Sequence, residues 1–353
     1  MTVRPGFPAV SGAATFLDIR RALESEVAHS AAGAIRAGIY PFHTNALVTS
    51  KATMAVDVGA FIAAIDRNGL VRVANDGTVS VSISAAPGSG SRWSVVYVKQ
   101  RESGAPMSDG ADGPVIDKVE STTSLSAARA LLPVGALEFG TVEVPAGASA
   151  TNSVGVVITQ TYLYTAPFGG KVFVRNSTEL AAWSPVDGSE AFQIDTGVTY
   201  RRIAGAWKAW ESDWATYTPS YVSVTPGSGG SQGSRWRLVG GDIEIDHGLL
   251  WGGAGSAIDG VSGVVISIPD GFTMTPDYKL YEHVGQGSAN ADNAGSAPSP
   301  LTMARVGSSS TRLMYLAQNS SGTYITEGNV GYSAPVTFTS TGTVSGRARV
   351  RVA

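Results

Sequence analysis

The chain has 353 residues, of which 15% are charged and 43 are glycine. This length predicts two or three domains, and a glycine-rich composition with few charges favours β structure with many turns. The formal net charge of −3 excludes the strongly basic surface that proteins use to bind nucleic acid. The absence of cysteine excludes disulfides, thiolate catalysis and cysteine-bound zinc.

The sequence also argues against membrane insertion and against a resident cofactor. No apolar run approaches the roughly 20 residues of a membrane-spanning helix, and the N-terminus lacks the basic and then apolar pattern of a secretory signal. A chain that acts outside a cell would then leave it by lysis, as a virion part does. The four histidines are scattered without metal-ligand spacing, so we assign no metal ligands and no cofactor.

Apolar residues at spacings of three and four predict one amphipathic helix in the N-terminal segment, residues 1–43. Thr15 and Asp18 resemble the two side chains of a capping box, so the helix should begin there. It should end near His29, before a stretch of alanine and glycine. The apolar face, expected to pack on the first β-domain, is formed by Phe16, Ile19, Leu23 and Val27.

Residues 44–160 are predicted to form an antiparallel β-domain, which would be the anchor of the molecule. Alternating apolar residues on both sides of Asn75-Asp76-Gly77 predict a hairpin with a left-handed Gly77, in which Val73 faces Val79. Further strands are predicted at 93–98, 137–144 and 153–160, with loops at 103–113 and 121–126.

Residues 161–217 are predicted to form a thin, tryptophan-rich neck. The segment has only short strand-like pieces and is too small for a large core of its own. Apolar side chains of this size are best buried against neighbouring copies of the chain, so we expect subunits to meet here. The candidate residues of this oligomer interface are Trp183, Trp207, Trp210 and Trp214.

Residues 218–353 are predicted to form a C-terminal antiparallel β-sandwich head. A two-residue turn, Gly240-Gly241, separates two alternating runs, and if Val239 faces Asp242, apolar residues meet on one face of the hairpin. In the same register Arg237 meets Glu244 on the other face, and this agreement supports the hairpin. Further strands are predicted at 263–268, 312–318, 336–339 and 346–352, with an exposed loop at 289–300.

Two features of the predicted head could bind a receptor. Arg347, Arg349 and Arg351 form a basic strand face that would attract an anionic wall polymer, although a solvated face or an ion pair between subunits is the simpler explanation. Trp251 and Tyr332 lie near predicted loop ends, where aromatic rings can stack on sugars, although such residues often belong to a core. These five residues are our receptor-binding candidates.

Other motifs carry weaker functional interpretations. Asp242, Glu244 and Asp246 could form a calcium site or a glycosidase pair, but their facing arginines favour a charged outer strand face. Residues 109–113 could bind a metal, but their sequence is more typical of a pair of turns. The glycine-rich string 227–233 lacks the lysine of a phosphate-binding loop. We assign no catalytic residue.

Three groups of motifs resemble the minor tail and baseplate proteins of siphophages that infect actinobacteria. Strings of the predicted anchor resemble their N-terminal β-domain, strings of the neck resemble their connector, and strings of the head are similar to their C-terminal domain. The strings are 91–98 with 136–147 in the anchor, 169–175 with 193–200 and 205–207 in the neck, and 214–219 with 236–245 and 264–269 in the head.

The resemblance implies a structural virion protein at the tail tip, commonly trimeric. Its N-terminal domain would bind other phage tail or baseplate proteins, and its head would bind a bacterial surface glycan. Many weak saccharide contacts on each trimer would together give firm attachment. We therefore expect a mainly β, intertwined homotrimer that attaches the phage to its host and is not an enzyme. The alternatives are a baseplate adaptor that binds no receptor and a glycan hydrolase acting through Glu244 and Asp246.

Overall fold

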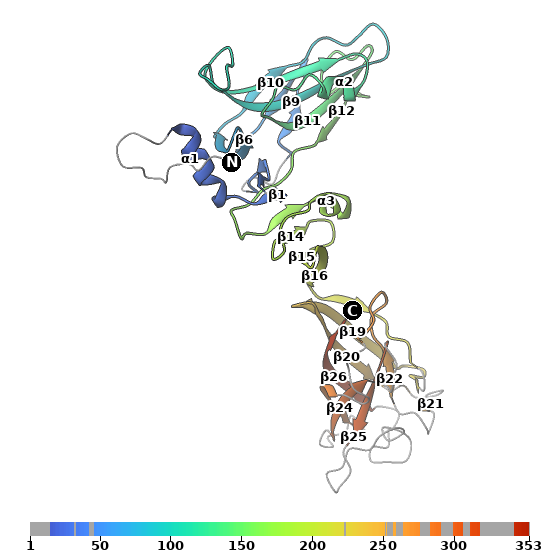
Figure 1. Cartoon of the computed structure of the whole chain (residues 1–353). Helices are drawn as coiled ribbons and strands as arrows, with labels where there is room; N and C mark the ends of the chain where they lie inside the picture. Colours follow the sequence, from blue (N-terminus) through green and yellow to red (C-terminus); the bar gives the residue numbers. More distant parts are fainter. Residues whose placement is uncertain are drawn as a thin grey trace. The chain divides into compact units, whose positions relative to one another are not determined.

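The structure, a computed structural model, describes residues 15–31, 33–41, 46–221, 224–250, 252, 257–258, 264–275, 283–290, 299–305, 311–317 and 342–352. The protein is mainly β, as predicted, and it divides into two compact units (Figure 1). The first unit is Met1–Thr196 with Arg201–Trp207, and the second is Gly197–Tyr200 with Lys208–Ala353. Among the described residues, no helix is both long and apolar enough to cross a membrane.

The N-terminal helix begins at the predicted capping box and ends earlier than predicted. In α1 (Phe16–Leu23), the Thr15 hydroxyl accepts a hydrogen bond from the Asp18 amide at 3.3 Å, and the Asp18 carboxylate accepts one from the Thr15 amide at 2.9 Å. A 3₁₀ turn, η1 (Glu24–Glu26), follows, and His29 already lies in β1 (His29–Ala31). The helix stops because the next backbone groups pair with residues 166–168 instead of continuing the helical ladder.

A four-stranded antiparallel sheet forms one layer of the first unit, in the order β10-β9-β11-β12. The strands predicted at 93–98 and 137–144 are confirmed as β9 and β11, whereas the strand predicted at 153–160 forms only over residues 157–160, as β12. β10 fills the stretch between the two predicted loops, for which no strand was predicted, and the short helix α2 begins inside the second of them. Pro114 fits β10 because β10 is an edge strand of this sheet. The bounds are β9 (Ser91–Arg101), β10 (Gly113–Ser121), α2 (Leu125–Arg129), β11 (Ala136–Pro145) and β12 (Val157–Gln160).

Short strands form further small sheets in the first unit, in the orders β1-β2, β3-β6-β7 and β4-β5-β8. The predicted hairpin around Asn75-Asp76-Gly77 is wrong, because Val73 faces Ala63 in β6 and Val81 faces Val56 in β5. That loop connects two sheets, and Gly77 is not left-handed. The strands are β2 (Ala34–Ile35), β3 (Gly38–Ile39), β4 (Val48–Ser50), β5 (Ala55–Val58), β6 (Phe61–Asp66), β7 (Leu70–Asn75) and β8 (Val79–Ser82).

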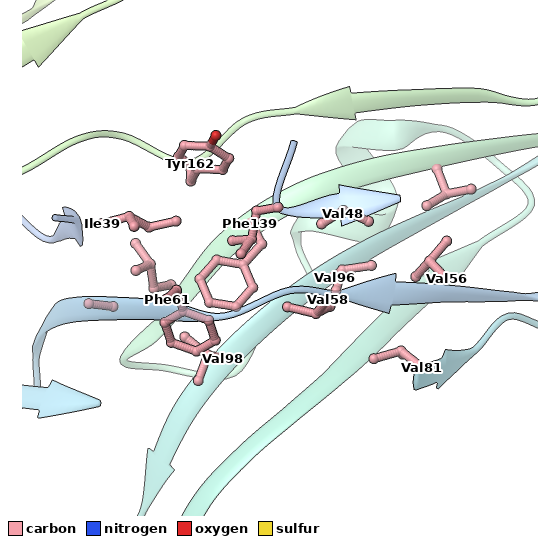
Figure 2. Packing of buried hydrophobic residues seen from close by; sticks show 14 of the residues in the cluster. Ile39, Val48, Val56, Val58, Phe61, Val81, Val96, Val98, Phe139 and Tyr162 are labelled. Atoms are coloured by element: carbon pink, nitrogen blue, oxygen red, sulfur yellow. The ribbon is translucent and has the colours of Figure 1, made fainter. Parts of the chain in front are cut away.

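The main core of the first unit lies between these small sheets and the four-stranded sheet. Phe61 of β6 and Phe139 of β11 meet edge to face, with ring centres 4.7 Å apart, and both are fully buried. Figure 2 shows them among valines contributed by both layers. The short strand β5 buries alternate residues, whereas the central strands β9 and β11 contain continuous buried runs, residues 94–99 and 139–142.

A β-α-β segment follows within the first unit. β13 (Val172–Val174) runs parallel to β14 (Glu190–Gln193), and α3 (Ser177–Ala182) connects them. Asn176, which opens a glycosylation-like pattern, caps α3 by accepting a hydrogen bond from the Glu179 amide at 3.0 Å. The boundary between the units falls within β15 (Val198–Ile203) and β16 (Ala206–Glu211).

One continuous antiparallel sheet dominates the second unit, in the order β19-β20-β26-β23-β24-β25-β22, with β17 also paired to β19. The register predicted for the β19–β20 hairpin is confirmed, including the pair Val239 and Asp242. Gly240 and Gly241 form its turn with φ of 64° and 83°, which only glycine adopts readily. The strands are β17 (Ala215–Tyr217), β18 (Val224–Thr225), β19 (Ser231–Val239), β20 (Asp242–Leu250), β21 (Ala257–Ile258), β22 (Val265–Ser267), β23 (His283–Asn290), β24 (Ser299–Arg305), β25 (Arg312–Ala317) and β26 (Thr343–Arg351).

The pairing of the described strands differs from the predicted sandwich of two sheets. Tyr221, just after β17, forms a bridge with Ile266 in β22, so the two ends of the sheet meet. The sheet thereby curls around one core that contains Ile243, Ile245 and Val350 (Figure 1). The strands predicted at 263–268, 312–318 and 346–352 are confirmed as β22, β25 and β26, whereas the one predicted at 336–339 lies outside the described residues.

Candidate functional site

A charged face covers three neighbouring strands of the second unit, β19, β20 and β26. Successive residues of a strand point to opposite faces, so the residues that alternate with the buried Ile243 and Ile245 all lie on the outer face. The register aligns them across the strands in two rows of arginine, carboxylate and arginine, and in a third row Asp242 faces Arg351 on one side and Val239 on the other. We name this set the arginine–carboxylate ladder: Arg235, Arg237, Asp242, Glu244, Asp246, Arg347, Arg349 and Arg351.

Ion pairs within the chain connect the ladder. Arg237 lies 2.7 Å from Glu244, and Arg349 lies 3.0 Å from Asp242. Arg347 lies 3.6 Å from Glu244 and 3.5 Å from Asp246. The predicted basic face of the last strand is therefore paired with acidic residues of the same chain, which agrees with the simpler explanation given for the three acidic residues.

The ladder still exposes more positive than negative charge. Its five arginine side chains are 38% to 67% exposed, whereas its three carboxylate side chains are 15% to 32% exposed. Five arginines against three carboxylates give a net charge of +2 on a chain whose formal net charge is −3. A local positive surface of this kind attracts anionic ligands even when the whole protein is acidic.

Trp214 joins the ladder, although the sequence suggested it for an oligomer interface. The guanidinium carbons of Arg235, Arg237 and Arg347 lie 4.5, 4.7 and 5.8 Å from its ring centre. Such cation–π contacts hold the arginines in place without using their N–H donors, some of which bind the carboxylates of the ladder. The structure therefore brings together two sets of residues that the sequence analysis kept apart.

An open depression of about 440 Å³ lies beside the ladder. Its floor includes Gly233 of β19 and Gly248 of β20, which face each other, and Ser345 of β26, which faces Gly248. This row, which we name the glycine row, is the next outward-facing row after Arg235, Asp246 and Arg347. The complete lining is Thr216, Gly233, Ser234, Arg235, Asp246, His247, Gly248 and Ser345.

Ser234 and His247 also contribute to the lining, although they alternate with the outward-facing Gly233 and Gly248, so their side chains point to the inner face of the sheet. Ser234 is 7% exposed, and its hydroxyl has no hydrogen-bond partner among the described residues. His247 is 2% exposed, and its Nε2 lies 3.0 Å from the Tyr221 hydroxyl. Burial lowers the pKa of His247 to about 4, partly offset by Asp246, so the imidazole is neutral at pH 7.

The other predicted interface tryptophans lie elsewhere. Trp183 is 2% exposed inside the first unit, where its Nε1 donates to the His29 carbonyl at 2.8 Å, so its side chain is already covered by its own chain. Trp207 packs on Trp183 with ring centres 5.2 Å apart, and Trp210 contacts the Gly240-Gly241 turn in the second unit. Both remain partly exposed.

Two receptor-binding candidates, Trp251 and Tyr332, lie outside the described residues. The candidates of the last strand, Arg347, Arg349 and Arg351, are described and belong to the ladder. Sequence reasoning missed the glycine row, because Gly233, Gly248 and Ser345 are far apart in sequence and come together only through the register of three strands.

The acidic loop of the first unit holds side chains rather than a metal. Asp109 binds Arg67, and its Oδ1 accepts a hydrogen bond from Lys99 Nζ at 2.6 Å. The hydrogen bond from Lys99 is the largest cause that lowers the pKa of Asp109 to about 2. Asp112 accepts hydrogen bonds from Ser103, and residues 110–111 form a bend rather than the predicted pair of turns. No group of three acidic or histidine residues in the described part of the chain is placed to hold a metal ion.

Comparisons of the chain with protein-family models, curated proteins and solved structures find no significant match.

Proposed function

We propose that this protein is a structural component of a phage tail tip that attaches the virion to its bacterial host. The second unit would bind a surface saccharide or wall polymer, and the first unit would bind other tail or baseplate proteins. The observation that carries the proposal is the arginine–carboxylate ladder, with its exposed arginines, its stacked Trp214 and the adjoining depression. The resemblance of the three groups of motifs to siphophage tail proteins supplies the biological setting.

The chemistry of the ladder suits a polyhydroxylated, anionic polymer. Guanidinium groups bind carboxylates and phosphates through paired hydrogen bonds, and an aromatic ring offers a face to the apolar side of a sugar. Each contact would be weak because the face is open to water. Firm attachment then requires several copies acting together, which raises the effective concentration of every further contact.

We propose a homotrimer for this reason, with contacts near the boundary of the two units. Trp207 and Trp210 are partly exposed and lie outside the ladder, so they are the candidates for contact between copies. The solution mass of the full chain, measured by light scattering, should then be three times the 36.3 kDa of one chain. A mass of 36.3 kDa at micromolar concentration would contradict the trimer.

Binding of the labelled full chain to intact actinobacterial cells tests the attachment function. We expect saturable binding that weakens as salt rises, because salt screens the exposed arginines. The double variant R347E/R349E should lose binding, whereas R72E/R129E, which reverses two exposed arginines of the first unit, should bind as the wild type does. Equal binding by both double variants would show that the ladder is not the attachment surface.

A baseplate adaptor that binds no receptor is the second candidate function. One observation favours a protein-docking surface on the first unit: Val154 is fully exposed and Val157 is 53% exposed, beside β12 at the edge of its sheet. Exposed apolar groups next to an open strand edge suit pairing with another protein. The same surface would also serve an attachment protein that is anchored through its first unit, so cell binding has to distinguish the two functions. If the wild type bound none of the hosts tested, the adaptor would be the better proposal.

A further inference from the structure

We propose that the depression beside the ladder binds one acidic sugar unit of a surface glycan, with its anionic group on Arg235 and Arg347 and its ring over the glycine row. The proposal rests on the attachment function above and adds the class of ligand and its place. It differs from general attraction to the ladder because it requires the empty space as well as the charge.

The space is not required by the fold. A Cβ atom at Gly233 would meet no atom within 4 Å, and one at Gly248 would meet only the Gly233 carbonyl oxygen, at an ordinary 3.6 Å. Neither glycine has a positive φ. Glycine weakens the interior of a strand, so two facing glycines that the backbone does not need indicate a place where another molecule approaches closely.

The size of the space suits a sugar. A volume of about 440 Å³ lies at the lower end of the range for small-molecule sites and accommodates one or two sugar rings. A free phosphate ion would leave most of it empty. The two glycines add no polar side chain to the floor, as suits the apolar underside of a pyranose ring, whereas Thr216 and Ser345 add hydroxyl-bearing residues to the lining.

The charge beside the depression indicates that the ligand is an anion. Arg235 Nη2 lies 2.8 Å and Arg347 Nη2 lies 3.5 Å from the same oxygen of Asp246. Arg347 also reaches Glu244, which is bound by Arg237. Three arginines therefore share two carboxylates at this end of the ladder, and the two next to the depression are about half exposed. A carboxylate or phosphate on the sugar would balance the extra positive charge.

The test uses the full chain and three immobilised probes: oligogalacturonate, its methyl ester and polyglycerol phosphate. The first has acidic sugar rings, the second has the same rings without charge, and the third has charge without rings. We expect the wild type to bind oligogalacturonate at least about tenfold more tightly than either of the others. Equal binding to oligogalacturonate and polyglycerol phosphate would overturn the proposal, because charge alone would then explain retention.

The variant G233V separates the space from the charge, because it fills the floor of the depression and leaves every charged residue in place. We expect it to lose at least about tenfold in affinity for oligogalacturonate. The control is Q232V, which introduces the same side chain one residue earlier, on an exposed residue outside the depression. Unchanged binding by G233V would overturn the proposal.

A second variant covers the case in which G233V does not fold. R235Q/R347Q keeps the space and removes the two proposed anion ligands, so it should lose the preference for oligogalacturonate over the methyl ester. Retention of that preference would overturn the proposal. Failure of this proposal can be distinguished from failure of the attachment function. If G233V attaches to cells as well as the wild type does, the protein still attaches the phage to its host, but the depression is not the binding site.

Discussion

The guanidinium carbon of Arg235 lies 4.5 Å from the ring centre of Trp214, and the same arginine donates hydrogen bonds of 3.0 and 2.8 Å to Asp246. One arginine thus connects an aromatic ring, a carboxylate and the border of the depression. Because its two partners fix its position, Arg235 can bind a ligand with little further loss of side-chain freedom.

Removing the Trp214 ring should weaken both the fold and attachment. W214A removes the contact shared by three arginines, so we expect a loss of about 1–2 kcal/mol in the free energy of unfolding and weaker binding to cells. W214F keeps an aromatic face, so it should retain most of the stability and most of the binding to cells. Urea unfolding and cell binding of the two variants provide the measurements, and wild-type binding by W214A would exclude Trp214 from the attachment surface.

The turn of the β19–β20 hairpin should tolerate no side chain at Gly241. Its φ is 83°, and a Cβ there would lie 3.2 Å from Cζ3 of Trp210. We expect G241A to lower the free energy of unfolding by about 1–3 kcal/mol. G233A is the matched control in the same hairpin, because a Cβ at Gly233 meets open space, and it should not destabilise the protein. Equal unfolding midpoints for the two variants would contradict the assigned turn.

A buried ion cluster should stabilise the β-α-β segment of the first unit. Glu179 caps the Arg175 amide at 2.8 Å, and its Oε1 lies 3.5 Å from Nη2 of Arg36, which is 3% exposed. Arg36 also packs on Trp183, and burial lowers its pKa to about 10.

We expect E179Q to cost roughly 3–5 kcal/mol in urea unfolding, because it leaves a buried guanidinium without its counter-charge. E24Q is the control, because Glu24 pairs with a more exposed arginine and its removal should cost under about 1 kcal/mol. A similar loss in both variants would show that the Arg36 pair contributes no more than an ordinary surface pair.

The sequence predicted the fold best where three independent patterns agreed. In the β19–β20 hairpin, apolar pairing, charge pairing and a Gly-Gly turn all indicated one register, and that register is observed. Around Asn75-Asp76-Gly77 apolar alternation and the loop composition indicated a hairpin, but no charge pairing fixed the partner strands. Alternation and a turn sequence alone cannot show which strands lie next to each other.

The candidate site was predictable only in part, because most of its contacts join strands that are far apart in the sequence. Alternation along one strand identified Arg347 and its neighbours as one face, because that periodicity is local. Their pairing with Glu244 and Asp246, the stack on Trp214 and the glycine row all depend on which strands are adjacent. Adjacency across more than 100 residues leaves no signal in the spacing of a single sequence.

His247 should make the stability of the second unit depend on pH between about 4 and 6.5. Its folded-state pKa is lowered to about 4 from an ordinary value of 6.5, so in this range the unfolded chain binds a proton that the folded chain does not. The contribution is fully present above pH 6.5 and is lost as the pH falls to about 4, with a size of up to about 3 kcal/mol.

Other shifted groups act at lower pH, so the effect of His247 can be separated from theirs. The pKa of Glu120 is lowered from 4.5 to about 2 by hydrogen bonds from Lys118 and Ser84, which outweigh the opposing effect of burial. Its contribution is lost only below pH 4.5. Urea unfolding at pH 7 and pH 5 should therefore show a loss for the wild type that is absent from H247Q, which keeps a polar partner for the Tyr221 hydroxyl. An equal loss in H247Q would mean that His247 is not the group that titrates.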